Sequence, residues 1–247
     1  MTVELMRILS NERVAEGTYR MELQGDTSSI TAPGQFVNFL IDGYYLRRPM
    51  GVSDWKDDNL TVYYRVVGGG TARMSEYTEG MLIDTLVGLG NGFDLFVPAV
   101  TKAERVVVVG GGLGYSPLFS LSRMLHEKNV NYDLVVGFNE KAFVFEADAF
   151  NGYADSIQII TVDGSYGKKG FATDHIDISR YDYYFACGPE NMLKAVHILG
   201  IEGQLSFEAR MGCGFGVCMG CSCKTLTGYK RICVEGPVMY SSEVLFD

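Results

Sequence analysis

The spacing of apolar residues divides the chain into two parts of different character. Before Pro98, apolar residues alternate with polar ones or form short runs between turn residues, at 18–23, 35–41 and 60–67. β-Branched and aromatic residues in runs of this length favour strands. About six such strands predict a β-barrel over residues 1–98.

A second pattern begins at Arg105. Residues 106–109 form a buried run that leads into glycines, and apolar residues then recur at helical spacing over 118–125. Three further buried runs alternate with helix-compatible segments, one of them at 189–199. This order predicts a parallel sheet with covering helices. The runs lie at 134–137, 157–160 and 183–186.

The residues Val97-Pro98-Ala99 mark the expected boundary between the two parts. After Leu205 the chain becomes rich in glycine and cysteine and loses helical periodicity. We therefore predict three units: a barrel domain at 1–98, an α/β nucleotide-binding domain at 99–205, and a small C-terminal domain at 206–247.

Composition narrows the functional classes. The 247 residues carry 21 Lys+Arg against 30 Asp+Glu, a formal net charge of −9, which gives no basic surface for nucleic acid or an anionic membrane. The N-terminus has no apolar stretch of signal-peptide length, and no window is long and apolar enough to span a bilayer. These features predict a soluble cytoplasmic protein.

The cysteines carry the strongest chemical signal. Cys213-x4-Cys218-x2-Cys221-x11-Cys233 begins with the plant-type spacing of a [2Fe-2S] cluster. Interleaved glycines would let backbone N–H groups approach sulfur. Structural zinc and plain thiols stay open as alternatives. Cys223 shares a strand face with Cys221, and we expect it to be a packed thiol.

The glycines after the first buried strand of the second domain suggest a diphosphate site at the start of a helix. The run Gly110-Gly111-Gly112-Leu113-Gly114 is not a G-x-G-x-x-G, so a bare structural turn stays open. Together with Cys187-Gly188-Pro189, it resembles the nicotinamide domain of ferredoxin reductase-like flavoenzymes. Glu140 follows the next strand, where a carboxylate would accept from a ribose hydroxyl and repel a 2′-phosphate. NADH is therefore favoured over NADPH.

The barrel contributes a third set of residues. Arg48 can pair with a diphosphate, and Pro49 would fix the strand beside a flavin ring. Tyr63 and Arg65 share one strand face, and Thr71 is expected to cap a helix over 72–77. Each motif alone is equally typical of a surface turn or a capped loop.

The sequence contains no candidate residues for hydrolysis or phosphoryl transfer. The three histidines, at positions 126, 175 and 197, lie far apart and in no ligand or triad spacing. No nucleophile elbow, P-loop or H-E-x-x-H helix is present. Redox chemistry is the reaction class for which candidate residues remain.

With these motifs in order, the chain resembles the electron-transfer subunit of NAD-dependent (class 1B) dihydroorotate dehydrogenases, over essentially its whole length. The resemblance is most specific at 210–225, 229–238 and 89–93. It implies a ferredoxin reductase-like fold and cluster ligation by Cys213, Cys218, Cys221 and Cys233. The FAD contacts that it implies are Arg48, Pro49, Met50, Gly51, Tyr63, Tyr64, Arg65, Gly70 and Thr71.

One departure concerns the flavin. The family's Arg-Pro-x-Ser reads Arg48-Pro49-Met50-Gly51 here, so a hydroxyl expected near flavin N5 is absent. A backbone N–H or Ser53 would substitute for it, or the flavin potential would differ.

The resemblance also implies a function. NAD(H), FAD and a [2Fe-2S] cluster would convert two-electron into one-electron transfer, and electrons would pass to or from the FMN of a catalytic subunit in pyrimidine biosynthesis. It implies a heterotetramer of two chains of each kind. Phe215, Val217 and Met219, between the cluster ligands, would lie at the partner interface or pack the cluster.

Two other functions stay open. One is an iron–sulfur flavin subunit of a ferredoxin-NADP reductase or sulfide dehydrogenase complex. The other is a zinc-binding interaction module without enzymatic activity.

Overall fold

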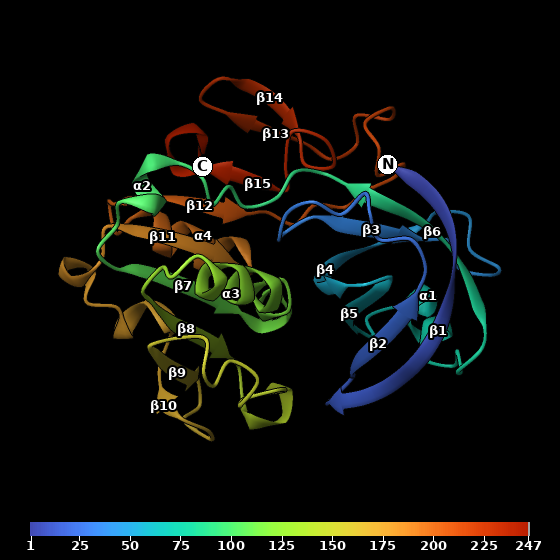
Figure 1. Ribbon diagram of the computed structural model, residues 1–247, viewed down its shortest axis with the longest axis horizontal. Helices are drawn as coiled ribbons and strands as arrows, with labels where there is room; N and C mark the ends of the chain where they lie inside the picture. The colour runs from blue at the N-terminus through green and yellow to red at the C-terminus, as the bar shows by residue number, and fades with distance from the viewer. Residues whose placement is uncertain (247) are drawn as a thin grey trace.

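The computed structural model describes residues 1–246 and consists of two bodies side by side, with the C-terminal segment lying along the top of both (Figure 1). The N-terminal body is a barrel and the second is a layered α/β domain. None of the helices in the described chain is long and apolar enough to cross a membrane.

Six antiparallel strands close the barrel in the order β1-β2-β5-β4-β3-β6. Alternate residues such as Met6 and Ile8 on β1, and Val62 and Tyr64 on β5, fill its interior. The predicted barrel is confirmed. The strands are β1 (Thr2–Ala15), β2 (Thr18–Gln24), β3 (Phe36–Phe39), β4 (Arg48–Lys56), β5 (Asn59–Arg65) and β6 (Leu82–Leu89), with helix α1 (Gly69–Met74) between the last two.

The second body contains a seven-stranded sheet in the order β10-β9-β8-β7-β11-β12-β15, parallel except for β15. The predicted parallel sheet is thus confirmed. Its strands are β7 (Val106–Gly111), β8 (Tyr132–Phe138), β9 (Ser156–Thr161), β10 (Lys168–Lys169), β11 (Tyr183–Cys187), β12 (Glu202–Ser206) and β15 (Val238–Tyr240). The α-helices are α2 (Pro98–Thr101), α3 (Leu118–Glu127) and α4 (Glu190–His197).

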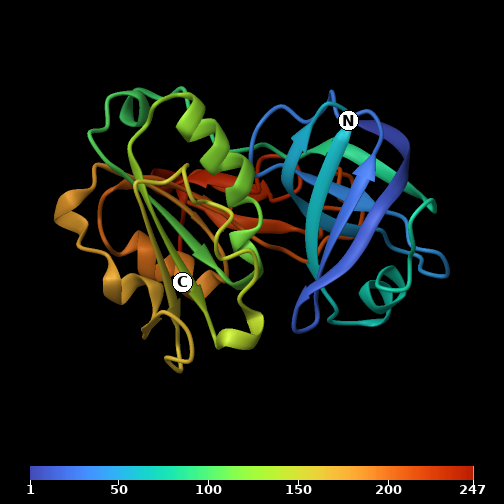
Figure 2. The same ribbon diagram turned by 60° about the horizontal axis from the view of Figure 1, so that its bottom comes forward.

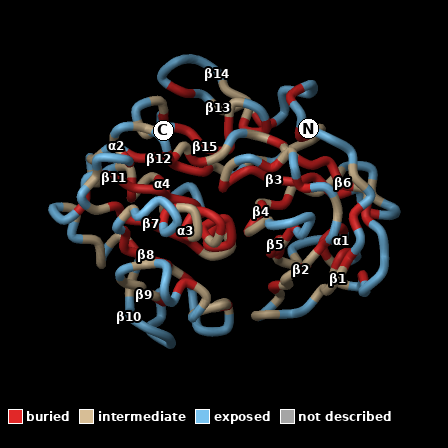
Figure 3. Tube along the Cα trace, in the orientation of Figure 1, coloured by how far each residue is buried: buried red, intermediate tan, exposed pale blue. Residues whose placement is uncertain are grey.

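Alternate side chains of the central strand β7 face two different cores. Val106 and Val108 pack with the leucines of α3 on one face. Val107 and Val109 pack with Leu193 of α4 on the other. A strand buried on both faces reads as a continuous valine run. Buried residues lie along the central strands of this sheet and along α3 (Figure 3).

The C-terminal segment adds to the sheet of the second body. Strands β13 (Ser222–Thr225) and β14 (Gly228–Arg231) form a hairpin, and β15 pairs with β12. Cys221 and Cys233 belong to the same apolar cluster as α4. Within the described residues this segment therefore shares its core with the α/β domain, and the three-unit division stays a prediction.

The two bodies lie side by side in Figure 2 as well, and hydrogen bonds and ion pairs join them. The Ser53 hydroxyl of β4 donates to the Ser116 carbonyl at 2.9 Å, and Arg123 of α3 pairs with Asp54 at 2.8 Å. Glu146 accepts from Arg20 and from the Tyr63 hydroxyl, each at 3.2 Å. These contacts fix the walls of the space between the bodies.

Candidate functional site

Two adjoining cavities lie between the barrel and the carboxyl ends of the parallel strands. The larger has a volume of about 710 Å³ and the smaller about 360 Å³. The end of parallel strands is where open α/β sheets bind ligands. Both cavities share five wall residues, so they are neighbours: Arg65, Val67, Leu113, Gly114 and Glu208.

The glycines after β7 form one wall of the larger cavity. Gly111, Gly112 and Gly114 line it, and Gly112 has a φ of +53° that favours glycine. A Cβ on Gly114 would lie 2.5 Å from the Cys187 carbonyl oxygen, so only glycine fits. Gly110 packs instead against Leu118, 2.9 Å from where its Cβ would be, and does not line the cavity.

The segment after β11 closes the same wall. Pro189 lines the larger cavity, and Cys187 lines the smaller one. Gly188 packs against the Gly111 backbone, where a Cβ would lie 3.1 Å from Gly111 Cα. The structure thus brings together the two glycine-containing motifs that the sequence separates by about 75 positions.

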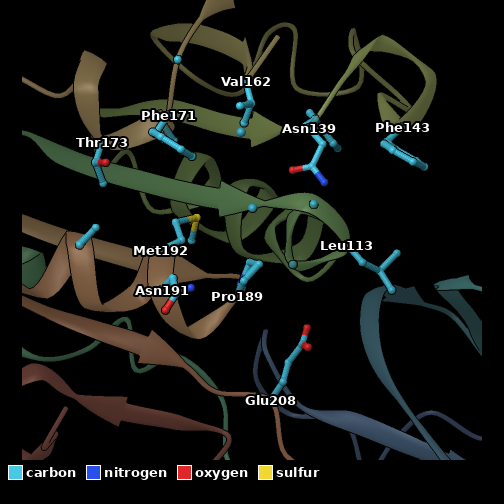
Figure 4. A pocket seen from close by; sticks show the side chains of 18 of the residues that line it. Leu113, Asn139, Phe143, Val162, Phe171, Thr173, Pro189, Asn191, Met192 and Glu208 are labelled. Carbon is cyan, nitrogen blue, oxygen red and sulfur yellow. The ribbon is translucent and has the colours of Figure 1, made fainter. Parts of the chain in front are cut away.

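Glu140 follows β8 as expected but does not itself line the cavity. Its neighbour Asn139 lines the larger cavity, as does Phe143, whereas Glu140 between them is exposed and does not. Phe171 and Met192 complete the wall and project into the cavity (Figure 4). The sequence signal for Asn139 was its position directly after a buried strand.

Residues of β4 and β5 line the smaller cavity. Seven of the nine expected flavin contacts meet there: Pro49, Met50, Gly51, Tyr63, Tyr64, Arg65 and Thr71. Arg48 and Gly70 do not line this cavity and contact one another, since a Cβ on Gly70 would lie 2.5 Å from Arg48 Nε. The Arg48 guanidinium also stacks over Tyr44, 5.2 Å from the ring centre.

Arg65 brings positive charge to both cavities. Its guanidinium stacks 4.6 Å from the centre of the Phe143 ring, and its buried Nη2 has no hydrogen-bond partner in the structure. An unpaired buried guanidinium nitrogen is costly unless an acceptor binds there. Arg65 therefore fits a phosphate oxygen.

Three details of the barrel motifs differ from expectation. Helix α1 begins at Gly69 with Gly68 as its N-cap, and Thr71 lies inside the first turn, where its hydroxyl accepts from the Gly68 N–H at 3.3 Å. The prediction that Thr71 caps a helix over 72–77 is wrong, because the helix starts three residues earlier. Ser53 is buried and bonded to Ser116, so it does not replace the missing hydroxyl at Gly51.

Glu208 stands where the two cavities meet, and sequence reasoning missed it. It lies two residues after the end of β12, and its carboxylate projects into the space between the bodies (Figure 4). Desolvation raises its pKa. Burial, with the Glu208 charge as a second cause, also raises the pKa of the Cys187 thiol, to about 12. Cys187 is thus held as a neutral thiol.

The five cysteines of the C-terminal segment are free, and the four expected cluster ligands among them lie as two pairs. The Cys218 N–H donates to Cys213 Sγ at 3.4 Å, and the Cys213 N–H to Cys218 Sγ at 3.5 Å. Cys221 and Cys233 form the second, buried pair and interact through their thiols. Two thiols for each of two irons is the donor set of a [2Fe-2S] cluster.

The loop backbone favours thiolate at the first pair. Burial raises the pKa of Cys213, but the N–H groups of Cys218, Phe215 and Val217 outweigh it and lower that pKa to about 6. Desolvation, then Cys221, raises the pKa of Cys233 to about 12. Among residues 1–246, no three acidic, histidine or cysteine side chains group around a single point as one metal ion requires.

Cys223 belongs to neither of these pairs. It is half-buried on β13, packs against the core shared with α4, and burial raises its pKa. It lies near enough to Cys221 for that thiol to contribute to its raised pKa. Its expected role as a packed thiol stays a prediction.

Comparison with known proteins places this arrangement in a family. Residues 208–245 match the model of the iron-sulfur cluster binding domain of dihydroorotate dehydrogenase B. Among solved structures, the chain is similar to one described under "Insights into flavin-based electron bifurcation via the NADH-dependent reduced ferredoxin-NADP oxidoreductase structure". The TM-score is 0.86 at 28% identity, covering 98% of this chain and 90% of that one.

Curated relatives match over the full length. The dihydroorotate dehydrogenase B (NAD(+)) electron transfer subunit of Fusobacterium nucleatum is 38% identical, covering 99% of each chain. The corresponding subunit of a Geobacillus species is 39% identical, again covering 99% of each. Identity at this level over whole chains, with the cluster-domain match, means that this chain belongs to the family of dihydroorotate dehydrogenase B electron transfer subunits.

Proposed function

We propose that NAD(H), FAD and a [2Fe-2S] cluster occupy three adjoining sites on this chain and together perform the electron transfer that defines its family. The observation that carries the proposal is the order of the sites. The larger cavity adjoins the smaller one through Arg65 and Glu208. The smaller one reaches Met211 and Pro237, which flank the cysteine segment.

In this proposal the larger cavity binds the nicotinamide nucleotide. Gly111, Gly112, Gly114, Pro189 and the Gly188 backbone give its diphosphate close access to the main chain. Gly110 supports this turn from inside the sheet, and Cys187 borders the nicotinamide end. Glu140 is exposed beside Asn139, which lines the cavity, and its charge there would disfavour a 2′-phosphate and so favour NADH.

The smaller cavity then binds FAD, which supplies the exchange between electron pairs and single electrons. Arg65 would hold phosphate, and Arg48, fixed between Tyr44 and Gly70, would supply a second guanidinium. Pro49, Met50 and Gly51 form the strand beside the ring, with Tyr63, Tyr64 and Thr71 on the adjoining wall. With Ser53 donating to Ser116, a backbone N–H would serve the flavin edge in place of the missing hydroxyl.

Cys213, Cys218, Cys221 and Cys233 would ligate the cluster. The proposed partner is the FMN-containing catalytic subunit of dihydroorotate dehydrogenase, in a cytoplasmic heterotetramer of two chains of each kind. The exposed loop around Cys213 and Cys218 supports this, because Phe215, Val217 and Met219 are 43%, 75% and 55% exposed and carry no charge. Apolar residues exposed beside a redox centre are suited to contact with a protein.

Chemical analysis of the anaerobically purified protein tests the cofactor set. We expect one FAD, two irons and two acid-labile sulfides per chain, and a brown-yellow colour. Stoichiometric zinc without sulfide would contradict the proposal.

A second candidate is a subunit of a ferredoxin-NADP-type oxidoreductase complex, which the 28% identity and TM-score of 0.86 to such a structure favour. Copurification from the native organism separates the two candidates. We expect the catalytic subunit of dihydroorotate dehydrogenase to accompany this chain; a second pyridine-nucleotide oxidoreductase in its place would favour the alternative.

A further inference from the structure

An apolar surface covers part of the outer wall of the barrel, away from both cavities. It is formed by the N-terminal half of β1 and the neighbouring parts of β6 and β3, and we call it the wall patch. Val3, Leu5 and Leu82 are 65%, 63% and 52% exposed there. The wall patch consists of Met1, Val3, Leu5, Leu40, Met81 and Leu82.

We propose that the wall patch is part of the surface that binds the catalytic subunit, continuous with the cluster loop at 213–219. The proposal rests on the proposed function. It adds a contact that lies in the flavin domain rather than in the cluster segment.

Strand alternation fixes the outward direction of these side chains. On β1, Met6 and Ile8 lie in the barrel core, so Val3 and Leu5 point to the other side. On β6, Ile83 and Val87 point inward and Leu82 outward. The N-terminal half of β1 is exposed along the outside of the barrel (Figure 3). Nothing within the barrel itself therefore covers these apolar residues.

Strand register connects the wall patch to the cluster loop. Val3 pairs with Leu86 of β6, and Leu86 pairs with Asn38 of β3, so the three side chains form one row on the outer face. Asn38 Nδ2 donates to the Cys213 carbonyl at 3.2 Å. A Cβ on Gly214 would lie 2.3 Å from the same nitrogen, so the loop rests directly on β3.

The charge within this surface is largely neutralised. Asp84, in the next row of β6, forms an ion pair with Arg47 at 2.7 Å, and Arg47 also donates to the Asn38 and Asp84 carbonyls. Arg7, opposite Leu82, stands at the far end of the patch. An apolar centre with charge at its edge is typical of the buried core of a protein interface.

The area of a stable protein interface indicates which partner covers the wall patch. A partner that accepts electrons from the cluster has to cover the cluster loop. A stable interface buries about 800 Å² per partner, a disc of about 16 Å radius. Val3 is two strands from Asn38, about 10 Å at the usual strand spacing. A footprint of this size centred near Asn38 reaches the wall patch, so the catalytic subunit, which has to cover the loop, is the occupant that we propose.

A charge placed in the wall patch tests the proposal. In the holoprotein, Leu5→Glu should weaken binding of the purified catalytic subunit at least tenfold, and Val3→Glu combined with Leu5→Glu should weaken it further, because each buries an unpaired carboxylate. Ile198→Glu is the matched control, since Ile198 is 71% exposed at the end of α4 on the other body. All variants should retain NADH-driven dye reduction, and Ile198→Glu should bind normally.

Equal affinity of Leu5→Glu and the unmodified chain would overturn the proposal. If the unmodified chain itself failed to bind the catalytic subunit, the proposed function would fail instead. A self-association of the isolated chain that Leu5→Glu abolishes would assign the patch to a second copy and also overturn it.

A measurement on the unmodified complex needs no folded variant. Hydroxyl-radical footprinting should show protection of Leu5 and Met81 when the catalytic subunit binds, with Ile198 unchanged. Undiminished labelling of Leu5 and Met81 in the complex would contradict the proposal.

Discussion

At the residue scale, one buried carboxylate holds together the amino ends of the parallel strands. Asp133 of β8 is 1% exposed and accepts from both Arg105 and Tyr181 and from the Ser156 hydroxyl, at 2.7 to 3.0 Å. Burial raises its pKa, but these hydrogen bonds, with Arg105 foremost, outweigh it and lower the pKa from 3.8 to about 2. The ionised form is therefore the stabilising one.

We expect Asp133→Asn to destabilise the protein by about 3 kcal/mol at pH 7, because it leaves Arg105 partly unpaired. A carboxyl with a lowered folded pKa stabilises above its unfolded pKa and loses this effect as pH falls through the folded value. The deficit of the variant should therefore shrink between about pH 4 and pH 2. Urea unfolding followed across this range measures it; a deficit independent of pH would show that Asp133 does not act through its charge.

Nucleotide preference also belongs to single residues. Glu140→Arg replaces a carboxylate with a phosphate partner, and we expect it to lower kcat/KM for NADH and raise it for NADPH. Lys141→Ala, on the adjacent exposed residue, is a suitable control. Because Asn139 rather than Glu140 lines the cavity, an unchanged preference would assign the ribose contact to Asn139.

At the element scale, the sequence predicted the strands that local pattern defines. β2, β5, β7, β8 and β11 follow short runs of β-branched and aromatic residues, and α3 follows a helical repeat. The long strand β1 was missed because its exposed apolar residues break the alternation expected of a half-buried strand. β15 was missed because three residues carry no periodicity, and only its pairing with β12 defines it.

Prediction of the candidate site from the sequence is also limited to residues that lie in local motifs. Motif order identified the glycine turn, the β4–β5 residues and the cysteines. Glu208 and the Asn38–Cys213 contact depend on the packing of distant segments, and no local pattern predicts such contacts.

The cluster segment gives a prediction that separates ligand from neighbour. Cys218→Ser should abolish the electron paramagnetic resonance signal of the reduced cluster, because Cys218 completes the exposed pair with Cys213. Cys223→Ser should leave that signal nearly intact, since Cys223 packs on β13 outside both pairs. Loss of the cluster in Cys223→Ser with retention in Cys233→Ser would identify Cys223 as the fourth ligand.

At the scale of the whole molecule, the proposed sites of electron entry and electron exit lie in different places. In the proposed assignment, electron entry from NADH uses the two cavities between the barrel and the α/β domain. Electron exit needs the cluster loop, whose apolar residues face outward. The cavities and the exposed loop therefore lie at different places on the molecule, and their activities can be altered independently.

The isolated chain should therefore reduce artificial dyes with NADH and fail to oxidise dihydroorotate, which should require the added catalytic subunit. Met219→Glu places a charge on the cluster loop at a residue that is 55% exposed and has a φ of +60° in the structure. It should lower coupled dihydroorotate oxidation at least tenfold while NADH-driven dye reduction stays within twofold, with Ile198→Glu as the control. Iron and sulfide content must be unchanged for the comparison to hold. Dihydroorotate oxidation by this chain alone would show that pyrimidine chemistry resides here, and normal coupling in Met219→Glu with an intact cluster would place electron exit on another face.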